Sequence, residues 1–327
     1  MKNYFNFNLS GKQFFPIWLL FYVLVLLPYF GIILFANKTE AVAAPLLALL
    51  LIIVGSFTFY FYMAKLFINH TRYNGESLVF SGKFSSYIGM VLKGFFLSII
   101  TLGIYYAWFT RDMMRFFVNQ TWLRSAPFKF KGEGATLFVI LLLTMLPIML
   151  ISLLMGIIAA GKTLSGGTPE ITYLPVVIQL ITFVVLIPFM YYLYKWMVDV
   201  EYKEYRIKWK TDFWQSCVQI LIQVALTVIT LGIYFPLLYL KLYKYFAERT
   251  FAESPAKTMN FGYELEPQKD FLFVWGQTLL SIITLGFYYP WAIVKIYNRV
   301  FSKTYTRVVS EQQLQTVTPP PLPYATV

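Results

Sequence analysis

Long apolar stretches and short alternating segments follow one another along the chain. Four apolar runs, Phe14–Phe35, Pro45–Ile68, Leu137–Ala160 and Tyr173–Met197, each exceed the roughly 20 residues that a membrane-crossing helix needs. Only short connections separate the first run from the second and the third from the fourth. The pattern therefore predicts four transmembrane helices that are arranged as two hairpins.

Several short segments alternate between polar and apolar residues with a period of two. They are Asn3–Leu9, Phe128–Lys131, Tyr205–Lys210 and Met259–Glu266. This period is typical of a half-buried β-strand, although an extended linker lying on lipid headgroups gives the same pattern. We expect short strands that pair with one another beside the membrane, because isolated strands are marginally stable.

Three stretches are nearly superimposable, namely Leu97–Trp108, Leu226–Leu237 and Leu280–Trp291, and each contains the core T-L-G-x-Y. A near-identity that occurs three times predicts an internal repeat. We predict one membrane domain over residues 1–310, built from five units at about 4–77, 78–125, 126–202, 203–258 and 259–310. The Pro-rich residues 311–327 are predicted to form a disordered tail.

Each repeated core predicts a turn between two helices. Gly103, Gly232 and Gly286 stand where a helix needs a glycine just beyond its last turn, and Pro236 and Pro290 stand where a second helix would begin. The alternative is one kinked helix, since Gly and Pro are common in membrane helices. The turn interpretation makes each core either a thin double crossing or a re-entrant hairpin.

The amino-acid composition indicates that the predicted helices lie in a membrane. The chain of 327 residues is 58% hydrophobic and 13% charged, whereas soluble domains are about 25% charged. This excludes an ordinary soluble enzyme and a disordered chain. The predicted fold class is an all-α polytopic transmembrane protein of repeated helical hairpins with short juxtamembrane β-strands.

Charge then gives an orientation. The net charge is +12, from 27 Lys and Arg against 15 Asp and Glu. If every unit enters the membrane and returns, 25 of the 27 basic residues lie on one side and only Lys38 and Lys162 lie on the other. Single crossings by the three T-L-G units would divide the basic residues 12 against 15. The positive-inside rule favours the first arrangement, with both termini in the cytoplasm.

The repeated T-L-G-x-Y-[YF]-P-W cores and the aromatic–basic stretches after them resemble the YjgN-like family of bacterial inner-membrane proteins. The clearest matches are Thr101–Trp108 and Thr284–Trp291. Two positions depart from the family pattern: Ala107 replaces the proline in the first core, and Leu237 replaces the tryptophan in the second. The resemblance covers about residues 4–307. It implies a multipass protein of the bacterial inner membrane, and it implies no activity because the family is defined by a domain of unknown function.

One face of the predicted helices carries polar residues at spacings of three and four. The candidate polar path consists of Gln219, Gln223, Thr227, Thr230, Gln277, Ser281, Thr284, Ser98 and Thr101. These residues favour either a lining for a solute or hydrogen bonds between helices, which is the commoner use of such residues in membranes.

Basic residues follow each repeated core and form a second candidate set. The candidate headgroup-binding residues are Arg111, Arg115, Lys241, Lys244, Lys295 and Arg299. Such residues bind anionic lipid headgroups or phosphates, or they only orient the protein and extend towards the cytoplasmic interface.

No residues for catalysis, cofactor binding or metal binding are predicted. The apolar runs contain no Asp, Glu or His, and Cys217 and His70 are the single cysteine and histidine. We expect no enzyme activity.

The first function hypothesis is passive or facilitated transport of a small or lipidic solute, and the alternative is a non-transporting membrane module that binds lipid headgroups or a partner protein. The expected partner is the bilayer, including anionic lipids. Nucleic acid is not an expected partner, because no basic stretch forms a separate soluble domain.

Overall fold

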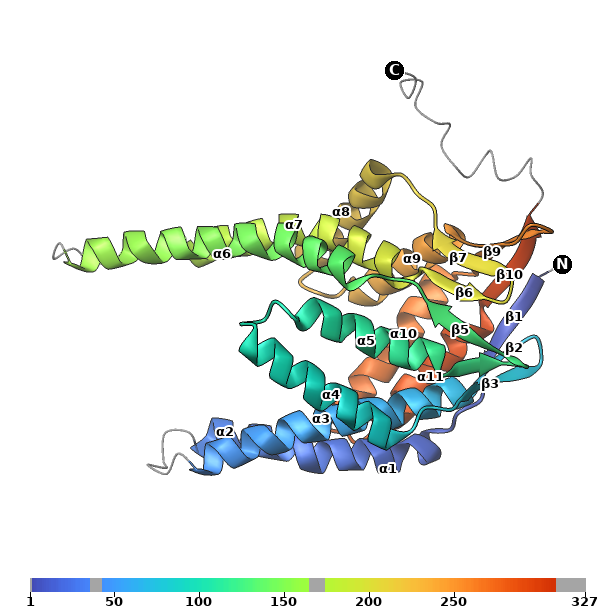
Figure 1. The fold of residues 1–327 in the computed structure, drawn as a ribbon, viewed down its shortest axis with the longest axis horizontal. Helices are drawn as coiled ribbons and strands as arrows, with labels where there is room; N and C mark the ends of the chain where they lie inside the picture. Colours follow the sequence, from blue (N-terminus) through green and yellow to red (C-terminus); the bar gives the residue numbers. More distant parts are fainter. Residues whose placement is uncertain (1, 36–42, 165–173, 310–327) are drawn as a thin grey trace, which may run out of the picture.

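The computed structural model of the protein describes residues 2–35, 43–164 and 174–309. Over these residues the chain alternates between short β-strands and pairs of α-helices. All the strands gather at one end of the molecule, and the helix pairs extend from them towards the opposite end (Figure 1). The molecule therefore has a β end and a helical end.

The strands form a closed antiparallel barrel in the order β1-β10-β9-β8-β7-β6-β5-β4-β3-β2. Their bounds are β1 (Lys2–Phe7), β2 (Thr71–Tyr73), β3 (Glu76–Phe80), β4 (Thr121–Leu123), β5 (Ala126–Phe130), β6 (Val200–Tyr202), β7 (Tyr205–Trp209), β8 (Thr250–Glu253), β9 (Thr258–Tyr263) and β10 (Thr304–Val309). Strand β1 closes the barrel, because its first half pairs with β10 and its second half pairs with β2.

This barrel overturns the predicted fold class. A closed ten-strand barrel accompanies the helices, so the predicted all-α polytopic class with short juxtamembrane strands is wrong. The alternating segments are strands, but their partners β2, β4 and β6 are only three residues long. A segment that short shows no detectable period. Closure also depends on pairing between β1 and β10, which lie at opposite ends of the sequence and share no local signal.

The helices form a ring of pairs beneath the barrel. Their bounds are α1 (Gly11–Phe21), a π-helical turn (Tyr22–Leu26), α2 (Leu27–Phe35), α3 (Ala43–Asn69), α4 (Phe84–Ile100), α5 (Tyr106–Asn119), α6 (Gly134–Leu164), α7 (Leu174–Met197), α8 (Phe213–Ile229), α9 (Phe235–Glu248), α10 (Pro267–Ile283) and α11 (Tyr289–Ser302). Each pair contacts the next, and α11 contacts α1 to close the ring.

Five aromatic side chains join the barrel to the helices. Phe7, Phe80, Phe130, Trp209 and Tyr263 end alternate strands, and each is at most 5% exposed. Each belongs to a different hydrophobic cluster with the helices of its own region. Burial of such a ring stabilises the fold by roughly 1.5–3 kcal/mol per side chain, so this layer fixes the helix pairs to the barrel.

Three helical segments are long and apolar enough to cross a membrane, judged over the described residues. They are Gly11–Leu34, Ala44–Asn69 and Gly134–Ile158. They match three of the four predicted spans. Within the fourth predicted span, Ile181–Met197 of α7 is an apolar segment below the length of a span, counted over the described residues. The predicted tail at 311–327 lies outside the described residues.

Candidate functional site

The three candidate turn glycines lie in tight connections between helices. Gly103 joins α4 to α5, Gly232 joins α8 to α9, and Gly286 joins α10 to α11. Their φ angles are +90°, +87° and +88°, values that glycine adopts without steric cost. Each glycine N–H donates to the carbonyl five residues earlier, at 2.7–2.8 Å. The chain therefore reverses at each core and returns to the barrel.

The threonine of each core holds its turn closed. The Oγ1 of Thr101 donates to the Leu97 carbonyl (2.7 Å) and accepts from the Tyr105 N–H (2.9 Å). Thr230 and Thr284 make the same two contacts in their own turns. One hydroxyl thus satisfies the end of the first helix and the start of the second. The T-L-G-x-Y spacing follows from this contact.

The leucine of each core occupies a strained position. Leu102, Leu231 and Leu285 have φ angles of +51°, +50° and +50°, a region that costs a residue with a side chain about 1–2 kcal/mol. Their side chains are 95%, 93% and 80% exposed. Isoleucines on both sides of Leu231, Ile229 and Ile233, are also largely exposed. The helical end of the molecule therefore presents apolar tips.

The candidate polar path is divided among separate helix pairs. Gln223 accepts from the Tyr234 hydroxyl (2.8 Å) within α8 and α9, and Gln277 accepts from the Tyr288 hydroxyl (3.0 Å) within the pair α10 and α11. The hydroxyls of Ser98, Thr227 and Ser281 donate to carbonyls four residues earlier in their own helices, while the side chain of Gln219 is exposed. These contacts favour the second alternative, hydrogen bonds within helix pairs, for Gln223 and Gln277.

In the pair α4 and α5, a glycine occupies the position that a glutamine occupies in the other two pairs. Gly94 stands where Gln223 and Gln277 stand in the other two pairs. A Cβ at Gly94 would lie 2.0 Å from the ring of Phe109. An aromatic ring thus fills the space that a Gln–Tyr contact fills elsewhere, which supports a packing role for the glutamines.

The candidate headgroup-binding residues lie on α5, α9 and α11, and several are engaged within the protein. Arg111 is paired with Asp112 (2.6 Å), and Lys244 lies 3.7 Å from Glu248. The ammonium of Lys295 donates to the Tyr288 hydroxyl (2.8 Å). Further, Lys241 lies over the Tyr234 ring (5.4 Å), Arg115 is exposed, and Arg299 is bound to Asp270.

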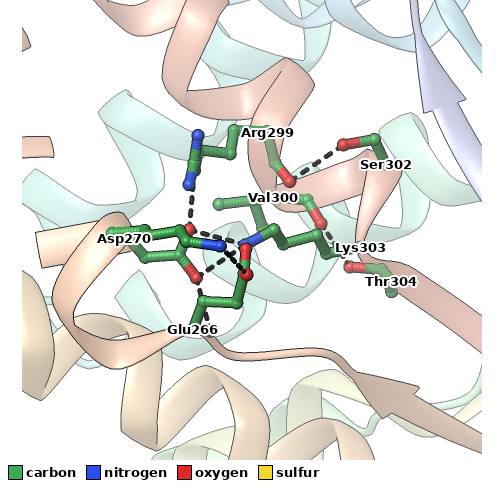
Figure 2. A network of polar contacts seen from close by, with 8 residues as sticks. Glu266, Asp270, Arg299, Val300, Ser302, Lys303 and Thr304 are labelled. Atoms are coloured by element: carbon green, nitrogen blue, oxygen red, sulfur yellow. Dashed lines mark hydrogen bonds and ion pairs between the residues drawn. The ribbon is translucent and has the colours of Figure 1, made fainter. Parts of the chain in front are cut away.

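Asp270 is the centre of a buried ionic cluster that the sequence patterns did not reveal. It is 1% exposed and lies in the first turn of α10. Arg299 donates to it at 2.6 Å, Lys303 donates at 2.7 and 3.0 Å, and the Glu266 N–H donates at 2.9 Å (Figure 2). The cluster fixes the start of α10 to the end of α11.

A signal for this cluster was present in the sequence. Glu266 and Asp270 are four residues apart, as are Arg299 and Lys303, so each pair lies on one helical face. Lys303 and Lys269 also bind Glu266, and these hydrogen bonds lower the pKa of the Glu266 carboxyl to about 2. An acidic face at the start of α10 and a basic face at the end of α11 therefore predict an ionic contact between the two helices.

A tyrosine-lined crevice lies between α9, α10 and α11. Its volume is about 800 Å³, and it extends from Gly232 in the turn to Phe301 beneath the barrel. Tyr239, Tyr243 and Tyr297 line it. Tyr239 and Tyr243 lie on α9, whereas Tyr297 lies on α11. Tyrosines from different helix pairs therefore face one central space.

A layer of aromatic rings lies at the base of the barrel. The Phe5 ring centroid lies 4.8 Å from that of Tyr73, 6.2 Å from that of Phe261 and 6.4 Å from that of Phe301. Phe301 lies on α11 and lines the crevice, whereas Phe5, Tyr73 and Phe261 line a cavity inside the barrel. This aromatic layer therefore lies between the two cavities.

Comparison with known proteins places these features in a family context. A family model described as "Bacterial protein of unknown function (DUF898)" matches residues 75–260, from the β2–β3 turn into β9. The inner membrane protein YjgN of Salmonella typhimurium (strain LT2) is 37% identical over 70 residues. That segment is 21% of this chain and 18% of that protein. No solved structure matches the chain.

Proposed function

The chain belongs to the DUF898 family of bacterial proteins of unknown function, and on that premise we propose that it is a multi-pass inner-membrane protein that binds a lipidic solute in its tyrosine-lined crevice. An inner-membrane location is supported by the similarity to YjgN and by the apolar helices. Beyond this location, we propose an orientation in the membrane, a five-unit repeat and a class of ligand. The proposal includes no catalytic step.

The proposed orientation has the barrel in the cytoplasm and every helix pair entering the membrane from that side. Exposed apolar tips at Leu102, Leu231 and Leu285 are costly in water and favourable in lipid. Helix α4 has 17 residues, a length of about 25 Å, so it ends inside a hydrocarbon core about 30 Å thick. Pairs α4–α5, α8–α9 and α10–α11 would then be re-entrant, whereas α1–α3 and α6–α7 would cross.

The proposed repeat contains five units, each with a helix pair bounded by strands of the barrel. Three observations support it. The same threonine contacts recur at Thr101, Thr230 and Thr284. Left-handed Leu-Gly turns recur at the same places. Finally, one aromatic residue at the barrel base belongs to each hydrophobic cluster.

The crevice is the observation that carries the ligand class. It follows α9, whose 14 residues measure about 21 Å, from the membrane-embedded tip to the barrel base. Its walls combine the rings of Tyr239, Tyr243 and Tyr297 with aliphatic side chains such as Ile293 and Val274. Tyrosine offers an apolar body and one hydroxyl, which suits an acyl or isoprenoid chain with a small polar head.

Binding is favoured over passage of a solute through an open pore. Gln223 and Gln277 of the candidate path hydrogen-bond within their own helix pairs, and the rings of Phe5, Tyr73 and Phe261 lie between the crevice and the barrel interior. These contacts favour a solute that stays in the crevice.

Native mass spectrometry of the purified full chain tests the proposal. We expect the wild-type protein to retain a bound lipidic molecule that survives detergent exchange. The variant Ile293→Trp fills the crevice and should lose that mass, whereas Ile33→Trp on the exposed face of α2 should keep it. An Ile293→Trp protein that retains the same bound mass would overturn the assignment of the site, and a wild-type protein without bound lipid would overturn the proposed function.

A further inference from the structure

The open end of the barrel contains a second cavity, which we call the barrel cup. It has a volume of about 400 Å³ and is lined by residues of the strands and of the hairpin turns, including Asn74, Arg124, Lys203 and Lys257. These turns lie at the ends of the strands that do not join helices. The cup therefore faces away from the helices, and its floor is the aromatic layer around Phe5.

The charge in the barrel cup is of one sign. Arg124, Lys203 and Lys257 are among its lining residues, which include no carboxylate. Glu76 lies 3.7 Å from Arg124, with both side chains about half exposed, and such a pair contributes little. Over the described residues, neither Lys203 nor Lys257 makes a salt bridge. Three cations at the mouth of a small cavity attract an anion.

Three cations on or next to the strands, outside the cup lining, are paired with carboxylates. Lys131 is paired with Glu201 (2.8 Å), Arg206 with Asp199 (3.1 Å), and Lys210 with Glu253. Carboxylates on neighbouring strands therefore neutralise these three cations. The mouth of the barrel cup instead carries three cations and no lining carboxylate.

Two of the cup cations occupy strained backbone positions. Arg124 and Lys203 have φ angles of +55° and +53°, and Asn74 has +52° in the equivalent turn of β2 and β3. Asparagine is well suited to this conformation, whereas Arg and Lys are not. A turn selected only for stability would carry Asn or Gly. The two basic residues are therefore placed at a cost in stability, which is typical of functional positions.

Aromatic rings form the wall of the cup beneath these cations. Phe128 stacks on Tyr202, with centroids 4.7 Å apart and an angle of 28°. The ammonium of Lys203 lies 5.7 Å from the Tyr202 ring centroid, and that of Lys257 lies 5.9 Å from the Tyr205 ring centroid. Such walls offer stacking surfaces for a planar ring, and the cations above them offer contacts for a phosphate.

We infer that the barrel cup binds a small soluble molecule that combines a phosphate with a planar ring, the class to which nucleoside monophosphates belong. The phosphate would lie at the mouth beside Arg124, Lys203 and Lys257, and the ring would lie against Tyr202 and the other rings of the wall. Only the side of access, the cytoplasm, rests on the proposed function. The cup itself is separate from the tyrosine-lined crevice.

Calorimetric titration of the full chain in phosphatidylcholine nanodiscs tests this inference. The probes are AMP, adenosine and inorganic phosphate. We expect AMP to bind more tightly than either of its parts, since only AMP reaches both the cations and the rings. An absence of AMP binding would overturn the inference, as would inorganic phosphate that binds as tightly as AMP.

A matched pair of double variants locates the site. Arg124→Asn/Lys203→Asn copies the residue found at Asn74, so the turns keep a compatible side chain, and AMP affinity should fall about 10- to 100-fold. Lys129→Gln/Lys208→Gln removes the same charge from strand positions outside the cup lining and should change the affinity less than about 3-fold. Equal losses in both would overturn the inference. Lys257→Gln, with an expected loss of about 5- to 10-fold, tests the same claim in a different turn.

Two further measurements separate this inference from other sources of binding. Addition of phosphatidylglycerol to the nanodiscs should leave AMP affinity unchanged, because the cup faces away from the membrane. Competition by that lipid would assign the cup to a lipid headgroup and overturn the soluble ligand. AMP binding should also be unchanged in Ile293→Trp, so loss of lipid from the crevice and loss of AMP from the cup are distinguishable.

Discussion

The turns at the two ends of the molecule share a backbone conformation and differ in their side chains. Over the described residues, six residues other than glycine have positive φ angles of 50–55°. Three of them, Leu102, Leu231 and Leu285, end the helix pairs, and the other three, Asn74, Arg124 and Lys203, lie in the barrel turns. The same strain therefore accompanies apolar residues at one end and polar or basic residues at the other.

This difference indicates what each end contacts. Strain alone would select Gly or Asn at all six positions. A leucine that is 93% exposed, as Leu231 is, gains free energy only when lipid surrounds it. An arginine or lysine at the barrel mouth gains free energy only when an anion or the aqueous phase contacts it. The comparison thus supports the proposed orientation, in which the helical end lies in the membrane and the barrel end lies in water.

The largest effect on the free energy of unfolding is expected for replacement of Asp270, which lies between the barrel and the helix tips. Replacement by Ala leaves Arg299 and Lys303 without their buried partner and should lower the free energy of unfolding by about 3–5 kcal/mol. Asp199→Ala, which removes a partly exposed partner of Arg206, should cost only about 0–1 kcal/mol. Chemical denaturation in detergent micelles measures both. Similar values for the two variants would show that burial does not distinguish them.

Leu231→Asn tests the membrane end directly. Asn fits the backbone better than Leu, but an amide in hydrocarbon without a partner costs roughly 2 kcal/mol or more. We therefore expect net destabilisation by about 1–2 kcal/mol, measured by unfolding in nanodiscs. An increase in stability would mean that the tip lies in water.

Lys203→Asn makes the same replacement at the aqueous end and should have the opposite sign. Relief of the backbone strain should raise the free energy of unfolding by about 0.5–1 kcal/mol, because the amide remains hydrated. The same unfolding assay measures it. A loss of stability at Lys203 equal to that at Leu231 would remove the distinction between the two ends.

The smallest effect concerns acid stability near the Asp270 cluster. The pKa of Glu266 is lowered from 4.5 to about 2, first by the hydrogen bond from Lys269 and then by that from Lys303. Because the folded-state pKa is the lower one, this contribution to stability is complete above about pH 4.5 and is lost as the pH falls to about 2. Glu266→Gln should flatten the stability profile in that window. An unchanged profile would mean that the Glu266 carboxylate contributes nothing to the stability of the fold.

The sequence predicted local features well and the global fold class poorly. The turns at Gly103, Gly232 and Gly286 depend on residues within one repeated core, and the structure has positive φ at all three. The apolar runs depend only on length and composition, and three of them are candidate spans. The barrel depends on three-residue strands and on β1 pairing with β10, for which no local pattern exists.

The candidate site residues show the same limit. Gln223 and Gln277 form a regular polar face in the sequence, yet each contacts a tyrosine eleven residues later in its own helix pair. Spacing predicts which residues share a face, but it does not predict what that face contacts. Asp270 was missed for the reverse reason, since its partners lie about thirty residues away in the sequence.

Cysteine accessibility in intact cells tests the central claim most directly. On a Cys217→Ser background, single cysteines replace Thr39 between α2 and α3, Ser125 at the barrel mouth and Leu231 at a tip. With an impermeant thiol reagent added outside, we predict labelling at Thr39 alone. Ser125 should react only after permeabilisation, and Leu231 should stay unlabelled under both conditions. Labelling of Ser125 from outside would contradict the assignment of an aqueous cytoplasmic end and a membrane end.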